Sequence, residues 1–375
     1  MSAPERRTLP RRDWIILPAL ALLTVMAMLG AAEGGTQVLW PEQKTEPCLA
    51  GPGKSRPHAN CVSRSKAAEG PWVENRYNDC GYRATGPCQG PESDDRDRIV
   101  VMGSSTSWAY LVPFDKGWSV TAAKTLAAQC GHPVDIQSLS GFNNLNMSAQ
   151  RIGEALALKP KLVALVVAPF DLLEAPVGGF NPAPQPPAAA PVEPPAEPNL
   201  LGRAKAVISG SRAATVAQHY LFQNADVYVA AYMRYGDKAD FMRTPLTPAW
   251  QARLKYLDDG IGYLADRLKP QGVSFMVVYA PQQAQAALVA EHTRLAGVDA
   301  TQIDREIAAI ATKHGAIFAD GSSGFSGVAA PASYFYNTDG HLNSSGQQLL
   351  GRVAAQALLA AKPATLCPAA GGATA

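Results

Sequence analysis

From residue 97 onward, short unbroken apolar runs alternate with longer amphipathic stretches, and this alternation constrains the fold more than any other feature. The runs that we expect to be strands are 98–102, 134–138, 162–168, 273–279 and 316–319. The expected helices are 117–130, 146–158, 248–269, 301–314 and 343–361. Apolar strands without polar alternation are typical of a parallel sheet covered on both faces. The sequence therefore predicts an α/β domain over 97–361, a three-layer α/β/α sandwich around a five-stranded parallel sheet.

A charge-free apolar segment, 14–32, lies near the N-terminus and is long enough to cross a bilayer as a helix. The basic tail before it, residues 1–13, predicts a cytoplasmic N-terminus and an exported body, since positive charge stays inside. Gly30 and Ala32 are small enough for a signal-peptide cleavage site, so cleavage remains an alternative. The apolar stretch is longer than a typical signal core, which favours an uncleaved signal-anchor.

Six cysteines follow this segment, and none of them forms a C-x-x-C pair. An even number of cysteines after an export signal suggests disulfides. Fifteen pairings are open to six cysteines, so connectivity is a hypothesis. The pairs that we expect are Cys48–Cys61 and Cys80–Cys88 within a Cys/Gly/Pro-rich leader, 33–96, and Cys130–Cys367, which would hold the C-terminal tail, 362–375.

An insertion separates the third and fourth expected strands. Its first part, 173–200, is rich in proline, which excludes helix and central strand and favours an extended chain. Its second part, 201–247, contains a stretch that looks helical and carries many aromatic residues. Two interpretations stay open: a lid over a site, or a surface linker followed by a packing helix.

Ligands of open parallel sheets bind at the carboxyl ends of the strands, so the residues just past each strand are the candidates for chemistry. "GSSTS" follows the first strand and places Ser105 at a strand–turn–helix junction, where a nucleophile can be presented beside free N–H groups. "SLSGFNNLN" follows the second strand. Gly141 there can bring its N–H close to a substrate oxygen, and Asn143 and Asn144 offer amide donors.

A nucleophilic serine needs a base, and the base needs an orienting partner. Six histidines are available, and only His341 lies in a polar, glycine-flanked loop with a carboxylate, Asp339, two residues away. Gln282 and Gln283 follow the fourth strand and either line the pocket or belong to a helix-capping loop. We see no phosphate-binding loop and no metal cluster, because Asp171 and Glu174 stand without a histidine, and we expect no cofactor and no metal.

A Gly-x-Ser after the first strand, a Gly after the second and D-x-H before the last helix together resemble the SGNH/GDSL-type hydrolases. The closing stretch "DGHLNSSGQQLLG" carries much of this resemblance, which covers roughly 97–361. It implies a flavodoxin-like SGNH hydrolase fold with Ser105 as nucleophile, His341 as general base and Asp339 as its orienting partner. The resemblance also implies an oxyanion hole from the N–H groups of Ser105 and Gly141. The residues after the second strand themselves indicate that Asn143 and Asn144 lie near the substrate.

Three positions depart from the family pattern. Ser104 stands where relatives carry Asp, Phe170 stands where they carry an oxyanion-binding Asn, and Asp339 lies two residues before the histidine, where many members have three. Phe170 has no donor group. This motivates an alternative function, a catalytically weak or inactive envelope protein that binds saccharide or a partner.

The resemblance implies a serine esterase or O-acyltransferase that acts on ester groups, expected to be acetyl groups, of a cell-envelope or exported polysaccharide. We expect a single-pass protein of the bacterial inner membrane with this domain in the periplasm. Its expected partners are an acylated saccharide, the membrane through the N-terminal helix and, for transfer, a membrane protein that delivers the acyl donor. The formal net charge is only +2, so the chain lacks the strong positive charge that typically attracts nucleic acid. We therefore do not expect nucleic acid as a partner.

Overall fold

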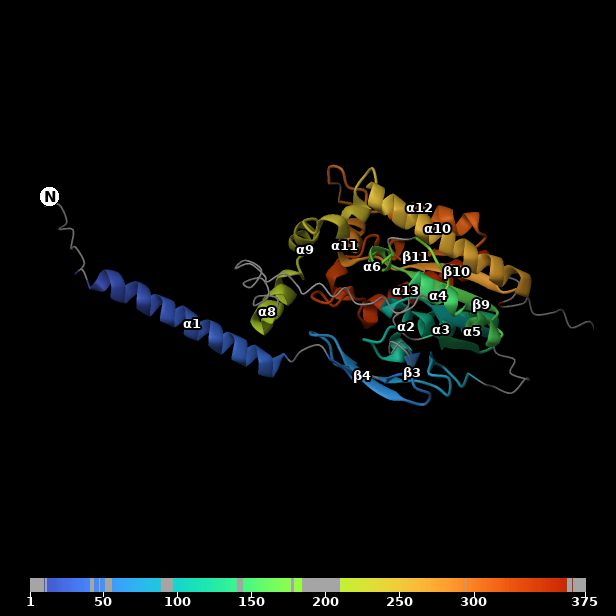
Figure 1. Ribbon diagram of the computed structural model, residues 1–375, viewed down its shortest axis with the longest axis horizontal. Coiled ribbons are helices and arrows are strands. Elements are labelled where there is room, and N and C mark those ends of the chain that lie inside the picture. Colours follow the sequence, from blue (N-terminus) through green and yellow to red (C-terminus); the bar gives the residue numbers. More distant parts are fainter. Residues whose placement is uncertain are drawn as a thin grey trace, which may run out of the picture.

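The computed structural model describes residues 10, 12–40, 44–46, 48–50, 56–88, 97–139, 144–176, 179–183, 210–293, 295–362 and 366. Helix α1, Asp13–Leu39, projects away from the rest of the chain at its N-terminal end (Figure 1). Its most apolar window has a mean hydropathy of 2.3 and buries none of its residues, so by length and composition this helix can span a membrane.

Five parallel strands form the centre of the molecule. Their order in the sheet is β11-β10-β9-β7-β8, and all pairings among them are parallel. The strands are β7 Asp97–Met102, β8 Val134–Ser138, β9 Leu162–Val167, β10 Ser274–Tyr279 and β11 Ile317–Asp320. Each lies within one residue of its expected bounds, because burial on both faces leaves an unbroken apolar run in the sequence.

Helices cover both faces of this sheet, which confirms the three-layer sandwich (Figure 1). One face packs against α3 Trp118–Cys130 and α13 Ser344–Ala361. The other packs against α4 Leu145–Gln150, α5 Ile152–Ala157, α10 Pro248–Leu268 and α12 Gln302–Lys313. The single helix expected over 146–158 is divided at Arg151, whose guanidinium donates to the carbonyl of Leu139 at the end of β8.

The expectation of a purely five-stranded parallel sheet is wrong at one edge. A sixth strand, β6 Arg83–Ala84, comes from the leader and pairs antiparallel with β8. The leader also forms a small antiparallel sheet of β1 Lys44–Glu46, β4 Val62–Lys66 and β5 Trp72–Arg76, and a two-stranded ladder of β2 Leu49–Ala50 and β3 Arg56–Pro57. These strands are two to five residues long, so they leave little periodic signal in the sequence.

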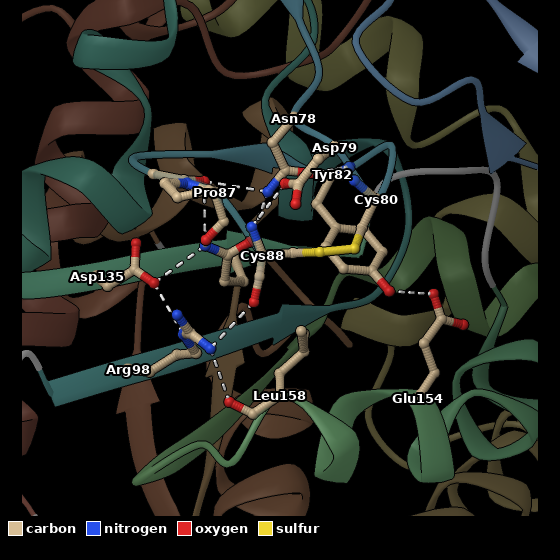
Figure 2. The surroundings of a disulfide bond; sticks show 12 residues. Asn78, Asp79, Cys80, Tyr82, Pro87, Cys88, Arg98, Asp135, Glu154 and Leu158 are labelled. Carbon is tan, nitrogen blue, oxygen red and sulfur yellow. Dashed lines mark hydrogen bonds and ion pairs between the residues drawn. A yellow bond between two sulfur atoms is a disulfide. The ribbon is translucent and has the colours of Figure 1, made fainter. Parts of the chain in front are cut away.

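Two of the three expected disulfides, Cys48–Cys61 and Cys80–Cys88, are present. The third would involve Cys367, which lies outside the described residues. Cys80–Cys88 holds the leader where it meets the sheet (Figure 2). Beside it, Arg98 of β7 donates to Asp135 of β8 at 2.8 Å, and Tyr82 donates to Glu154 of α5 at 2.7 Å. The disulfide closes a loop within the leader, and polar contacts such as that of Tyr82 with Glu154 fasten the leader to the sandwich.

The described part of the insertion consists of α8 Arg212–Leu221, α9 Ala225–Tyr232 and the short 3-10 helices Gly236–Lys238 and Asp240–Met242. The N-terminal end of α8 meets α1. There, the Glu33 carboxylate accepts from the Ser211 hydroxyl at 2.7 Å and from the N–H groups of Arg212 and Ala213. A carboxylate at a helix N-terminus satisfies donors that have no intrahelical partner. The apolar N-terminal helix is thus joined to the insertion.

Candidate active site

The turn after β7 depends on Gly103. Its φ of +131° lies in a region that side chains rarely adopt, and a Cβ there would lie 2.7 Å from the carbonyl oxygen of Val166 on β9. The chain therefore passes close against the neighbouring strand and enters the short helix α2 Ser105–Trp108 at once. This places Ser105 at the carboxyl edge of the sheet, at the first position of a helix.

Three side chains that the sequence singled out are brought into one hydrogen-bonded chain. The Ser105 hydroxyl lies 2.7 Å from Nε2 of His341, and Nδ1 of His341 lies 2.5 Å from Oδ1 of Asp339. Asp339 Oδ1 also accepts from the His341 N–H at 3.2 Å, so the carboxylate fixes both the ring and the backbone. With the proton on Nδ1 directed at Asp339, Nε2 can accept the serine proton.

The loop that carries Asp339 and His341 is closed on itself just before α13. Tyr336 N–H donates to the His341 carbonyl at 2.8 Å, and Phe335 pairs with Leu342 across the loop. Gly340 takes a φ of +88°, which allows the tight reversal between the two functional side chains. Because the loop is pinned at its base, His341 holds its position over Ser105.

The pKa of His341 reflects two opposing influences. Burial acts to lower this pKa, but the hydrogen bond to Asp339, the charge of Asp339 and that of Asp171 outweigh it, so the pKa is raised above its ordinary value of 6.5. The ring of Tyr110 stands edge-on to the imidazole, 5.8 Å between centroids. A base with these partners accepts a proton readily and stabilises the imidazolium that results.

A pocket of about 120 Å³ opens over the Ser105 hydroxyl. It is lined by Ser104, Ser105 and Thr106 on one side, by Phe170 and Asp171 on another, and by the 339–342 loop. The N–H groups of Ser105 and Thr106 begin α2, where no intrahelical carbonyl is available to accept from them. The pocket thus combines a hydroxyl that is hydrogen-bonded to an imidazole with backbone donors, at a size that suits a small group.

The other expected site residues lie in different places. Gly141 and Asn143 are outside the described residues. Asn144 is not among the residues that line this pocket, and its side-chain oxygen accepts from Met147 N–H at 3.0 Å as the N-cap of α4. Gln282 lines the pocket, whereas Gln283 is buried and is not among the lining residues. Phe170 lines it with half of its surface exposed and brings no donor.

The sequence named Asp171 only as an unsupported metal ligand and gave no reason to place its carboxylate beside Ser104. In the structure, Asp171 lines the pocket, and its carboxylate accepts a hydrogen bond from the Ala168 N–H at 2.8 Å. Burial raises the pKa of Asp171 to about 6, although hydrogen bonds from Ser104 and from the Ala168 N–H act in the opposite direction. The Ser104 side chain, at the position where relatives carry Asp, therefore faces a carboxylate from α6 Pro169–Leu173, the short helix that follows the neighbouring strand β9.

The leader supplies two further supports that the sequence gave no reason to single out. Arg83 is fully buried and donates to the carbonyls of Trp108, Ala109 and Val112 at 2.5–2.7 Å, which holds the chain that leaves α2. Glu69 accepts from the N–H of Thr338 at 2.8 Å and from its hydroxyl, one residue before Asp339. Both elements that carry the reactive side chains therefore rest on the leader.

Comparisons with known proteins give structural similarity only. No family model and no curated protein matches the sequence. Among solved structures, TesA matches at 15% identity over 70% of this chain and 98% of its own, with a TM-score of 0.39. A putative lipolytic protein of the G-D-S-L family from Desulfitobacterium hafniense DCB-2 matches at 11% identity, over 70% and 100% of the two chains, with a TM-score of 0.33.

A mutant of Axe2, an acetyl-xylooligosaccharide esterase from Geobacillus Stearmophilus, matches at 12% identity over 70% of this chain and 94% of its own, with a TM-score of 0.38. The SGNH hydrolase-like fold is visible in the chain's own architecture: the parallel strand order β11-β10-β9-β7-β8, with Ser105 just after β7 and His341 just before α13.

Proposed function

We propose that this protein is a serine esterase or O-acyltransferase that works through an acyl-enzyme on Ser105. The observation that carries the proposal is the Ser105–His341–Asp339 chain, with contacts of 2.7 and 2.5 Å inside a pocket at the carboxyl edge of the sheet. Serine nucleophiles are recognised by this geometry and these roles rather than by sequence position.

In the proposed reaction, Ser105 Oγ attacks the ester carbonyl while its proton passes to Nε2 of His341. The oxyanion that forms is stabilised by the Ser105 N–H, together with Gly141 as the second donor. His341 then returns the proton to the leaving alcohol oxygen, and the acyl group remains on Ser105. Asp339 stays ionised throughout and stabilises the imidazolium. Water or a sugar hydroxyl then attacks the acyl-enzyme while His341 accepts its proton. The bond between the acyl group and Ser105 Oγ breaks, the acid or the acylated sugar leaves, and His341 returns the proton to Ser105.

We further propose that the substrate is an acylated cell-envelope or exported saccharide, met on the outer side of a bacterial inner membrane. Two features of the chain support this location. Helix α1 is apolar enough to span a membrane, and the Cys48–Cys61 and Cys80–Cys88 disulfides suit an oxidising compartment. The volume of about 120 Å³ over Ser105 suits a short acyl group such as acetyl.

The proposal is tested by trapping the acyl-enzyme. The full-length protein in detergent is mixed with p-nitrophenyl acetate, quenched in acid and digested, and the peptide containing Ser105 is weighed by mass spectrometry. We expect acetyl on Ser105 and release of p-nitrophenol. A folded protein that neither releases p-nitrophenol nor gains acetyl contradicts the proposal. Addition of an oligosaccharide acceptor then separates the two reactions, because transfer yields acetylated sugar and hydrolysis yields acetate.

One observation favours the second candidate, an envelope protein that binds saccharide without turning it over. Phe170 occupies the pocket wall where an amide donor would help to stabilise the oxyanion. Loss of one such donor typically reduces kcat by about 10²–10³. Restoring it by Phe170→Asn discriminates the two candidates: an esterase gains kcat with p-nitrophenyl acetate, and a binding protein gains none.

A further inference from the structure

A second hollow lies beside the catalytic pocket and runs into it. Its volume is about 240 Å³, twice the roughly 120 Å³ over Ser105. Phe170, Gln282, Asp339 and Gly340 line both spaces, so a molecule whose ester sits over Ser105 has room to extend into the larger one. The larger space accommodates the part of a substrate that does not react.

The outer wall of this hollow is a row of aromatic rings from the insertion. Phe222, Tyr228, Tyr232 and Tyr235 follow one another, with centroids 5.1, 5.9 and 5.8 Å apart. The middle pair is stacked, and Tyr235 at the rim exposes 57% of its surface. Tyrosine rings combine an apolar face with a polar tip and lose little conformational freedom on binding.

The inner wall is the catalytic loop, and a buried amide network joins it to the insertion. Gln283 donates to the side-chain oxygen of Asn337 at 2.9 Å and to the carbonyl of Phe222 at 3.1 Å. Asn337 lines the hollow, and an amide whose oxygen is engaged in this way keeps N–H groups for another acceptor. The aromatic row is therefore held in register with the loop that bears Asp339 and His341.

The charges around the hollow are balanced. Among the described residues that line it, Lys238 and Asp339 carry charges of opposite sign, and the rest are aromatic, amide, hydroxyl or small, apart from the aliphatic Leu173. An occupant that suits such walls is uncharged, has apolar faces and carries polar groups at its edge. A sugar ring has this form, with C–H groups on its faces and hydroxyls around its rim, and each buried hydroxyl needs a hydrogen-bond partner.

We propose that the hollow lined by Phe222, Tyr228, Tyr232, Tyr235 and Asn337 is a subsite for a sugar ring of the acylated saccharide, adjacent to the ring whose ester is attacked. This inference rests on the proposed function and adds to it a second point of recognition. The insertion between β9 and β10 then determines specificity: it makes an oligosaccharide ester a better substrate than a small ester.

The test measures specificity as a ratio. The value of kcat/KM is determined for p-nitrophenyl acetate and for O-acetylated oligosaccharides built from neutral hexoses, pentoses and hexuronates, with full-length protein in detergent. Tyr235→Ala removes the ring at the rim of the hollow. Tyr220→Ala is the matched control, because Tyr220 is 63% exposed on α8 of the same insertion and is not among the residues that line the hollow.

We expect at least one oligosaccharide ester to exceed p-nitrophenyl acetate in kcat/KM, and Tyr235→Ala to lower the ratio of the two about tenfold. Tyr220→Ala should keep the wild-type ratio. The proposal is overturned if no oligosaccharide ester is preferred or if Tyr235→Ala leaves the ratio unchanged. It is also overturned if the variant instead lowers kcat/KM selectively for p-nitrophenyl octanoate, because the hollow then holds an acyl chain. Failure of the esterase itself is distinguishable, since wild type would then not release p-nitrophenol at all.

Discussion

Glu69 of the leader accepts two hydrogen bonds from Thr338, one from its N–H and one from its hydroxyl, and Thr338 immediately precedes Asp339. The carboxylate that orients His341 is therefore braced by a segment that lies outside the α/β sandwich and almost 270 residues away along the chain. We expect the leader to be needed for turnover as well as for stability.

Replacing Glu69 tests this support. Glu69→Gln keeps the shape of the side chain but weakens both hydrogen bonds, and bonds to a charged group contribute about 1.5–3 kcal/mol. We expect kcat for p-nitrophenyl acetate to fall roughly tenfold or more, with a changed midpoint in the pH profile because Asp339 is less firmly held. Glu74→Gln is the control, since Glu74 on β5 is exposed and pairs with Arg76. If Glu69→Gln and Glu74→Gln both keep the wild-type pH profile, Glu69 does not position Asp339.

The pH dependence of turnover should follow His341. The ring must be neutral to accept the serine proton, and its pKa is raised above 6.5, mainly because Asp339 outweighs the effect of burial. Activity is therefore lost as pH falls through a midpoint above 6.5. Asp339→Asn should reduce kcat by roughly 10³–10⁴, and it should move the midpoint of the residual activity to lower pH. Profiles of kcat/KM for both proteins check this, and an unmoved midpoint would count against the assignment of Asp339.

Stability should depend on a second buried acid. Burial, together with the charge of Asp320, raises the pKa of Asp304 to about 7 from an ordinary 3.8. The folded chain thus keeps a proton that the unfolded chain releases, so this contribution is complete below pH 3.8 and is lost as pH rises through 7. Asp304→Asn imitates the protonated form and should reduce the stability difference between pH 5 and pH 8.

Urea unfolding at the two pH values measures this difference. Asp299→Asn serves as the control, because the hydrogen bond from Arg305 lowers the pKa of Asp299 and keeps it ionised throughout this range. If Asp304→Asn and wild type lose stability equally between pH 5 and pH 8, a different group is responsible for the pH dependence.

The N-terminal helix should remain part of the mature protein. Glu33 at the outer end of the apolar stretch is engaged by Ser211, Arg212 and Ala213 at the start of α8, and Trp40 packs on His219 of the same helix. We expect the protein to partition with membranes and to resist extraction by alkaline carbonate. N-terminal sequencing provides the check: a soluble protein that begins near Glu33 would establish cleavage instead.

The sequence predicts the parts of this molecule that obey a local rule. Buried parallel strands leave apolar runs, and the turn after β7 leaves the Gly103–Ser105 signature, so both were accessible without coordinates. The antiparallel strand β6 was missed because two residues carry no periodicity. The roles of Glu69, Arg83 and Asp171 were missed because they come from contacts with Thr338, with the chain after α2 and with Ser104. Such contacts are a property of the fold, and no spacing along the chain encodes them.

The role of the insertion was also not predictable from the sequence alone. Its aromatic residues were visible in the sequence, and a lid and a packing helix were equally compatible with them. In the described part of the chain, α9 contributes rings to the hollow beside the catalytic pocket, which neither interpretation specified. The Gln283 side chain holds the insertion there by bonding to both Phe222 and Asn337, which are far apart in the sequence.

The central claim, that Ser105 is an activated nucleophile, is tested most directly by labelling the full-length protein with a fluorophosphonate that carries a fluorophore. Wild type, Ser105→Ala and Ser104→Ala are compared on one gel after circular dichroism has established that all three are folded. The account predicts labelling of wild type, retained labelling of Ser104→Ala and complete loss of labelling in Ser105→Ala. Labelling that survives in Ser105→Ala, or a folded wild type that does not react, would contradict it.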